Sequence, residues 1–82
     1  MISVIDAADK ETLNFLDMDI FGVRIKAYLN AYGTKEKFLM FWEQRNESGI
    51  TAAISSLDGD CTLCLTENAD FDEINSEKSF ID

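Results

Sequence analysis

The spacing of apolar residues at the start of the chain predicts a strand followed by a helix. Residues 2–5 alternate in character, which is typical of a short strand. Asp6 is a candidate N-cap, with Asp9 three positions later, for a helix that continues to about Asp17. One rough face of this helix carries its apolar residues, which are Ala8, Leu13, Phe15 and Leu16.

A second helix is predicted from Met18 or Asp19 to Tyr32, because apolar residues recur there at helical spacing. Gly33 can adopt the left-handed conformation that ends a helix. One apolar side contains Phe21, Ile25, Tyr28, Leu29 and Tyr32, and a second contains Val23, Ala27 and Ala31. A helix that is apolar on two sides is expected to be mostly covered.

Three strands are predicted next, and the turns between them set how they pair. Residues 37–45 are apolar on both faces at their centre and predict an inner strand with cover on both sides. The turn at 46–49 leads to a strand at 50–57, and Asp58-Gly59 forms a two-residue hairpin turn before a strand at 60–66. This turn pairs Leu57 with Asp60, Ser56 with Cys61, Ile54 with Leu63 and Ala52 with Leu65.

The last predicted element is a helix. Asn68 or Asp70 can cap it, and Glu73 completes a capping box with Asp70. The inward residues of this helix are expected to be Phe71, Ile74 and Ile81. The order β-α-α-β-β-β-α predicts an α+β fold in which helices pack on a small antiparallel sheet, as one domain over residues 1–82.

Charge narrows the classes of partner. The chain of 82 residues has a net charge of −9, of which residues 58–82 carry −7. Phosphate backbones and anionic lipids repel such a chain, so direct binding to nucleic acid or to a membrane surface is disfavoured. The longest apolar run, residues 38–42, is too short to span a bilayer. We therefore expect a cytoplasmic protein.

The scarcity of metal-ligating and nucleophilic residues excludes two further classes of functional site. With no His and two Cys, the chain lacks a four-ligand structural zinc site and a His-based catalytic triad. Cys61 and Cys64 have redox spacing, but residues three apart on a strand point to opposite faces. The simpler interpretation is that both cysteines are small residues of a strand. The alternative is that they carry out thiol chemistry or bind a metal.

Three other groups of residues have a structural and a functional interpretation. The acids at 67, 70, 72, 73 and 77 lack the EF-hand order, so they form a solvated helix face or bind cations loosely. The aromatic residues Tyr28, Tyr32, Phe38, Phe41 and Trp42 form a core or line a pocket. The basic residues Arg24, Lys26, Lys35 and Lys37 belong to a mixed-charge surface or face an anion.

Several stretches of the chain resemble the N-terminal half of a GNAT-type N-acetyltransferase, as found in two-part acetyltransferase-like proteins of Gram-positive bacteria. These stretches are residues 15–16, 24–33, 41–42, 49–55, 57–59 and 67–71. The resemblance covers most of the chain. It implies an order of strand, two helices, three antiparallel strands and a helix, which in the family is followed by a strand, a helix and two strands.

The cofactor motif of that family is missing. In the family, a Gln/Arg-x-x-Gly-x-Gly/Ala turn before the third helix holds the pyrophosphate of acetyl-CoA. Here residues 65–72 contain no Gly, no Arg and three carboxylates, which would repel a pyrophosphate. We therefore assign no catalytic, cofactor-binding or metal-binding residue, and expect acetyl-CoA only where a catalytic half completes the site.

The resemblance and the missing motif together predict a non-catalytic, acetyltransferase-like structural or binding module. It would be the N-terminal part of a longer N-acetyltransferase, packed against an intramolecular catalytic half, or it would form a homodimer. One alternative is a small acidic inhibitor or interaction protein that presents residues 58–82 to a basic partner. A second alternative is an acetyltransferase that binds acyl-CoA.

Overall fold

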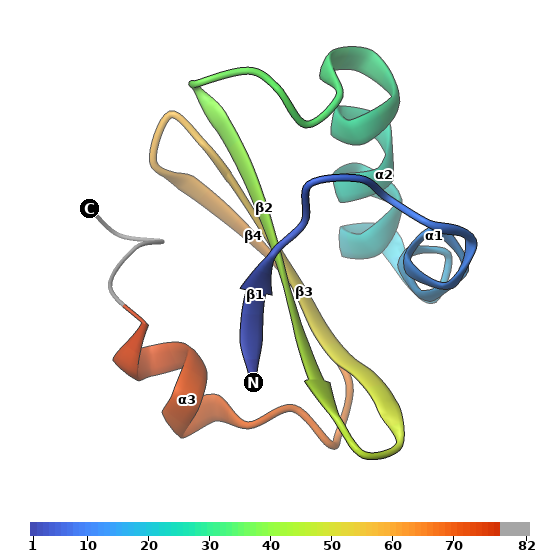
Figure 1. Ribbon diagram of the computed structural model, residues 1–82, viewed down its shortest axis with the longest axis vertical. Coiled ribbons are helices and arrows are strands. Elements are labelled where there is room, and N and C mark those ends of the chain that lie inside the picture. The colour runs from blue at the N-terminus through green and yellow to red at the C-terminus, as the bar shows by residue number, and fades with distance from the viewer. Residues whose placement is uncertain (78–82) are drawn as a thin grey trace.

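Alternating strand residues and capped helices give the chain an α+β fold, as the sequence predicts (Figure 1). The computed structural model describes residues 1–77. This part contains the strands β1 (Ile2–Val4), β2 (Leu39–Asn46), β3 (Gly49–Leu57) and β4 (Asp60–Leu65). It also contains the helices α1 (Lys10–Leu16), α2 (Ile20–Tyr32) and α3 (Phe71–Ser76).

The four strands form one antiparallel sheet in the order β1-β2-β3-β4. Asp58 and Gly59 both have positive φ angles, of 50° and 91°. A two-residue hairpin turn needs such angles to match the right-handed twist of the strands that it joins. This turn pairs Leu57 with Asp60, and all four cross-strand pairs expected from the sequence are present. The register of this hairpin is therefore confirmed.

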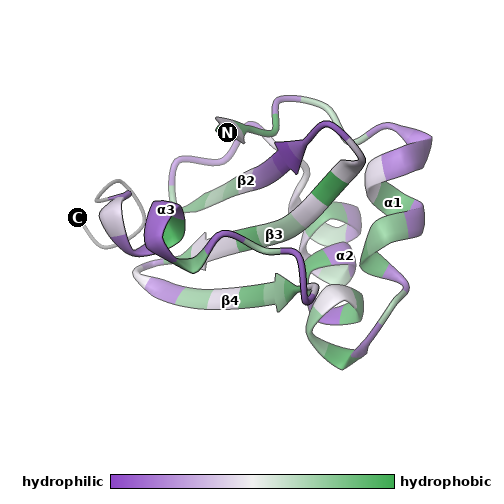
Figure 2. Cartoon of the chain, turned by 90° about the horizontal axis from the view of Figure 1, so that it is seen from below, coloured by the Kyte–Doolittle hydropathy of each residue, from purple (hydrophilic) through white to green (hydrophobic). Residues whose placement is uncertain are grey.

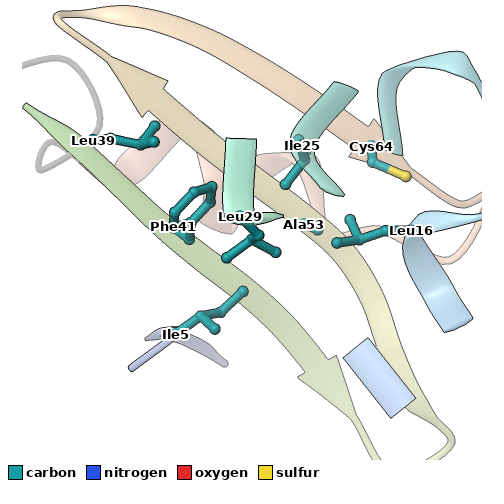
Figure 3. Close-up of a cluster of buried hydrophobic side chains, with 8 residues drawn as sticks. All are labelled: Ile5, Leu16, Ile25, Leu29, Leu39, Phe41, Ala53 and Cys64. Carbon is teal, nitrogen blue, oxygen red and sulfur yellow. The ribbon is translucent and has the colours of Figure 1, made fainter. Parts of the chain in front are cut away.

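The sheet is covered on both faces. Helices α1 and α2 lie on one face and α3 lies on the other (Figure 1). Phe41 and Trp42, neighbours on β2, are 1% and 5% exposed and belong to different core clusters. The expected cover on both faces of this strand is thus confirmed. The larger cluster, drawn in Figure 3, contains Ile5, Leu16, Ile25, Leu29, Leu39, Phe41, Ala53 and Cys64.

The expected start of the first helix is wrong. Asp9, rather than Asp6, is the N-cap of α1, and its Oδ1 accepts a hydrogen bond from Thr12 N at 2.9 Å. The reason lies in the sheet, because Ile5 N donates to Phe41 O at 2.8 Å and Ile5 is buried. The chain therefore needs residues 6–9 to reach the helix layer. Asp19, expected as a first residue of the second helix, is instead the N-cap of α2. Asp70 caps α3 as expected, but the capping box with Glu73 is only half formed, because Asp70 N donates to Gln44 Oε1.

Other expectations, about which residues are buried and where β2 begins, are also wrong. Helix α2 is not mostly covered, because α1 and the sheet contact one side of it only and Ile20 is 75% exposed. Phe71 is 54% exposed, because Ile74 is the residue of α3 that reaches the sheet. The strand expected from Lys37 begins at Leu39. The expectation for Ile81 lies outside the described residues.

Candidate functional site

The outer side of β4 is an open strand edge. Within residues 1–77, β4 pairs with β3 and no strand lies beyond it. Thr66 N donates to Thr51 O at 3.1 Å, so Thr66 is a hydrogen-bonded position of the ladder. Because hydrogen-bonded and non-hydrogen-bonded positions alternate along an antiparallel strand, the main-chain groups of Leu65 and Leu63 point away from β3. We call the outward main-chain groups of Leu63 and Leu65, with their side chains, the β4 edge.

The β4 edge lacks the features that usually protect a strand edge. Residues 61–65 contain no charged residue and no Pro, and the Leu63 side chain is 38% exposed. Met40, on the same face of the sheet, is also 38% exposed. In the sequence, Asp60 and Glu67 flank this segment, and both are exposed. Main-chain groups and apolar side chains thus face solvent together.

The two cysteines lie on opposite faces of β4 and are not joined in a disulfide, in agreement with the strand interpretation. Cys61 is exposed, and Cys64 is fully buried in the larger cluster (Figure 3). The Cys64 thiol donates to Asp19 Oδ1 at 3.6 Å. Burial and the neighbouring Asp19 carboxylate raise the pKa of Cys64 to about 12. This thiol is protonated and packed, which does not suit a nucleophile.

The turn between β4 and α3 uses its acids for capping. Asp70 Oδ1 accepts from Glu73 N at 3.1 Å, so a carboxylate of the chain already occupies the start of α3. Glu67 and Asp72 are exposed. Within the described residues, no three His, Cys, Asp or Glu side chains are grouped so that they could hold a metal ion. Glu67 and Asp72 thus belong to a solvated surface, whereas Asp70 and Glu73 make hydrogen bonds within the chain.

A buried amide, not identified from the sequence, fastens α3 to the sheet. Gln44 is 1% exposed, and its Nε2 donates to Asp70 O at 3.0 Å and to Glu73 Oε1 at 2.8 Å. Its Oε1 accepts from Asp70 N at 2.8 Å and from Thr51 Oγ1 at 2.7 Å. A polar cavity of about 230 Å³ lies beside it. Because every hydrogen-bonding atom of this amide has a partner, we interpret Gln44 as structural.

A second polar group joins α1 to β2. Glu43, only 8% exposed, accepts from Thr12 Oγ1 at 3.3 Å and forms an ion pair with Arg45. Arg45 also bonds Glu11 Oε1 at 2.7 Å. Hydrogen bonds to Glu11 and Glu43 raise the pKa of the Arg45 guanidinium. A signal for this group was present in the sequence, since Glu43 directly follows an apolar run in a strand with both faces buried.

The aromatic residues do not line one pocket. Phe41 and Trp42 are buried in separate clusters, and Tyr28 packs against the larger one. Tyr32 and Phe38 form an edge-to-face pair with ring centroids 5.5 Å apart, and both are exposed. The core interpretation therefore holds for Phe41, Trp42 and Tyr28, and is wrong for Tyr32 and Phe38.

The basic residues lie on and directly after α2. Lys26 Nζ bonds Asp17 Oδ1 at 2.9 Å. None of the ion pairs recorded within residues 1–77 uses Arg24, Lys35 or Lys37, and all three are exposed. The mixed-charge interpretation thus applies to Lys26, whereas the other three face solvent.

No protein-family model, no curated protein and no solved structure matches this chain. Among the helices of residues 1–77, none combines the length and the apolar composition that crossing a membrane requires. Of the features described above, the β4 edge has the clearest capacity to bind another chain, because outward main-chain groups lie beside exposed apolar side chains.

Proposed function

We propose that this chain is a non-catalytic, acetyltransferase-like binding module that completes its sheet by accepting a strand from another polypeptide at the β4 edge. The observation that carries this proposal is the open edge itself, where residues 61–65 carry neither charge nor Pro. The resemblance to the N-terminal half of an acetyltransferase supports it, since the family's sheet continues beyond the corresponding strand. A second copy and a catalytic half are the two possible donors of that strand.

Main-chain hydrogen bonds would supply much of the binding free energy. Each net hydrogen bond contributes about 1 kcal/mol, and Leu63 and Leu65 each offer one donor and one acceptor. The exposed part of Leu63 would be buried against the side chains of the incoming strand. Binding of this kind favours an extended, apolar segment and requires no cofactor.

Charge makes this binding dependent on salt. A second copy also carries a net charge of −9, and Asp60 and Glu67 lie at the two ends of the edge. At about 0.15 M salt the screening length is about 8 Å, so repulsion between the flanking acids falls as salt is added. Pairing of two copies should therefore strengthen with ionic strength.

The turn after β4 supports a module without catalytic activity of its own. Glu67, Asp70 and Asp72 stand where the resembled family places its pyrophosphate cradle, and Asp70 already caps α3. A cytoplasmic setting is part of the proposal, because the two cysteines form no disulfide and would stay reduced there.

The experiment compares two variants at one position of the edge. Leu63→Pro removes the outward main-chain N–H, which an edge strand tolerates, whereas Leu63→Val keeps it. Light scattering from low to high salt should show dimers for the natural chain and for Leu63→Val, and monomers for Leu63→Pro. Far-UV circular dichroism checks that each variant is folded.

Two outcomes would contradict the proposal. The first, a natural chain that stays monomeric at millimolar concentration and high salt, would exclude a second copy as the donor of the strand. The second is a folded Leu63→Pro variant that associates as strongly as Leu63→Val, since association would then use a surface other than the β4 edge.

A further inference from the structure

The face of the sheet that carries α3 is only partly covered by that helix. On this face, β2 presents Gln44, Trp42 and Met40 at alternate positions. Gln44 and Trp42 are buried there, whereas Met40 is 38% exposed. Figure 2 shows that β2 is hydrophobic at its beginning and hydrophilic at its end. Helix α3 therefore leaves an apolar end of this strand open.

The open region is a row of neighbouring positions across three strands. Met40 pairs with Ser56, and Ser56 pairs with Cys61. We call these three residues the Met40 row. Val4 and Leu63, which end the adjacent row, are also exposed. Single exposed apolar side chains are ordinary on a protein surface, but neighbouring ones mark a surface that another segment covers.

The path of α3 leads towards the Met40 row. At the start of the helix, Asp70 bonds the Gln44 side chain through both its N–H and its C=O. One turn later, Ile74 packs in the same cluster as Trp42. Gln44, Trp42 and Met40 follow one another on this side of β2, so the helix advances along β2 in the direction of Met40.

The residues after α3 have the length and the composition to cover the Met40 row. Glu77, the C-cap of α3, has extended backbone angles, with φ −83° and ψ 107°. Three extended residues span about 10 Å, and alternate positions on a strand are about 6.7 Å apart. A chain that continues from Glu77 therefore reaches the next position along β2. Phe80 and Ile81, the apolar residues of 78–82, come three and four residues after Glu77.

A segment of the same chain fits this surface better than a separate partner. Its attachment to α3 gives it an effective concentration in the millimolar range or above. A second copy, with its net charge of −9, and an anionic membrane would both be repelled by the charge of the chain. From the direction of α3, the extended cap and the apolar pair, we propose that residues 78–82 cover the Met40 row, with Phe80 or Ile81 packed on Met40.

This cover is separate from the proposed strand addition. Met40 lies on β2, and β3 stands between β2 and β4. The cover uses side chains on a face of the sheet, whereas strand addition uses the outward main-chain groups of the β4 edge. A chain that stays monomeric would still have this cover.

Oxidation of methionine tests the cover in the full chain. Dilute hydrogen peroxide converts exposed methionine to its sulfoxide, and peptide mass spectrometry gives a rate for each residue. The exposed Met1 and Met18 are references in the same chain. Phe80→Ser/Ile81→Ser should raise the rate at Met40 about threefold or more and leave the rate at Met18 unchanged. Low salt and dilute protein keep two copies apart during the reaction.

The control makes the same two changes on the other side of the sheet. Ile20→Ser/Phe21→Ser replaces an exposed Ile–Phe pair of α2 and should leave the rate at Met40 unchanged. Far-UV circular dichroism checks that both variants are folded. A second measurement needs no substitution, because nuclear Overhauser effects should join the Met40 ε-methyl group to the Phe80 ring or the Ile81 methyl groups in the natural chain.

Several results would overturn the inference. One is an equal rate at Met40 in the natural chain and in a folded Phe80→Ser/Ile81→Ser variant. Another is an equal rise in the control variant, which would mean that a general loosening of the fold exposes Met40. The absence of the expected Overhauser effects would exclude the contact. Overhauser effects that join labelled to unlabelled chains in a mixed sample would make a second copy the occupant.

Discussion

Ser55 is a single residue whose environment conflicts with its chemistry. It lies on β3 with 0% of its surface exposed, facing the helix layer of α1 and α2. Its hydroxyl has no hydrogen-bond partner within the described residues. A buried hydroxyl without a partner loses its hydrogen bonds to water on folding and gains none in return.

Ser55→Ala should therefore stabilise the protein by about 1 kcal/mol, because it removes the unpaired hydroxyl and adds no volume. The free energy of unfolding in urea measures this. Ser56→Ala, at a half-buried position of the same strand, has the same effect on strand propensity and serves as the control. A loss of stability in Ser55→Ala beyond that of Ser56→Ala would show that the hydroxyl has a partner in solution.

Cys64 gives a second prediction at the residue scale, which concerns alkaline pH. Its pKa rises from 9.0 to about 12 in the folded chain, mainly through burial and then through Asp19. Above pH 9.0 the unfolded chain releases this proton and the folded chain retains it. The free energy of unfolding should then fall by about 1.4 kcal/mol per pH unit from this group, up to the folded pKa. Below that range the thiol contributes no pH dependence.

The measurement compares the free energy of unfolding at about pH 8 and about pH 10.5. The natural chain should lose more stability than Cys64→Ala between these values. Cys61→Ala, which removes the exposed thiol, should behave like the natural chain. If the natural chain and Cys64→Ala lose stability in parallel, the thiol of Cys64 titrates in the folded state as it does in the unfolded one.

At the scale of elements, Gln44 determines whether α3 stays on the sheet. Helix α3 has six residues, too few to be stable alone, and Ile74 is its buried apolar anchor. Gln44 satisfies both the N–H and the C=O of Asp70, which precedes the helix. Removing this amide leaves both groups without their partner.

Gln44→Met, of similar volume, should therefore lower the free energy of unfolding by about 2–4 kcal/mol. Amide exchange at Ile74, whose N–H donates to Asp70 O at 3.1 Å, should become faster. Thr51→Val removes a single bond to the same amide and should cost about 1 kcal/mol. Unchanged exchange at Ile74 in Gln44→Met would show that Ile74 packing alone holds α3.

Local patterns explain most of the elements. The Asp58-Gly59 turn predicted the hairpin register, because two residues that tolerate positive φ leave one pairing of the flanking strands. The apolar run of β2 predicted burial on both faces for the same local reason. Local sequence could not show whether Asp6 or Asp9 is the N-cap of the first helix. The hydrogen bond between Ile5 and β2, which joins residues far apart in the sequence, decided where that helix could begin.

At the scale of the molecule, negative charge is concentrated around the turn between β4 and α3. Within residues 58–77 there are seven acids and no base, around the turn where the resembled family holds a pyrophosphate. Asp70 also occupies the start of α3. A bound diphosphate would meet repulsion and would have to displace this cap.

The isolated chain should therefore show no binding of acetyl-CoA by isothermal titration at low ionic strength, where repulsion is strongest. Repeating the titration at high salt tests whether screening of the acids restores binding. A dissociation constant in the micromolar range at either salt would contradict the prediction, since it requires about 8 kcal/mol of favourable free energy.

The amino-acid sequence by itself determined the order of elements, the hairpin register, the cap of α3 and the acidity of the C-terminal third, because each depends on residues close together in the chain. Only the tertiary structure decided which apolar surfaces stay uncovered. Periodicity shows that a helix has two apolar sides, but not how many neighbours the fold supplies to cover them. Solvent reaches the β4 edge because β3 covers one side of β4 only. It reaches the side of α2 that carries Ile20, Val23, Ala27 and Ala31 because the sheet and α1 cover the other side.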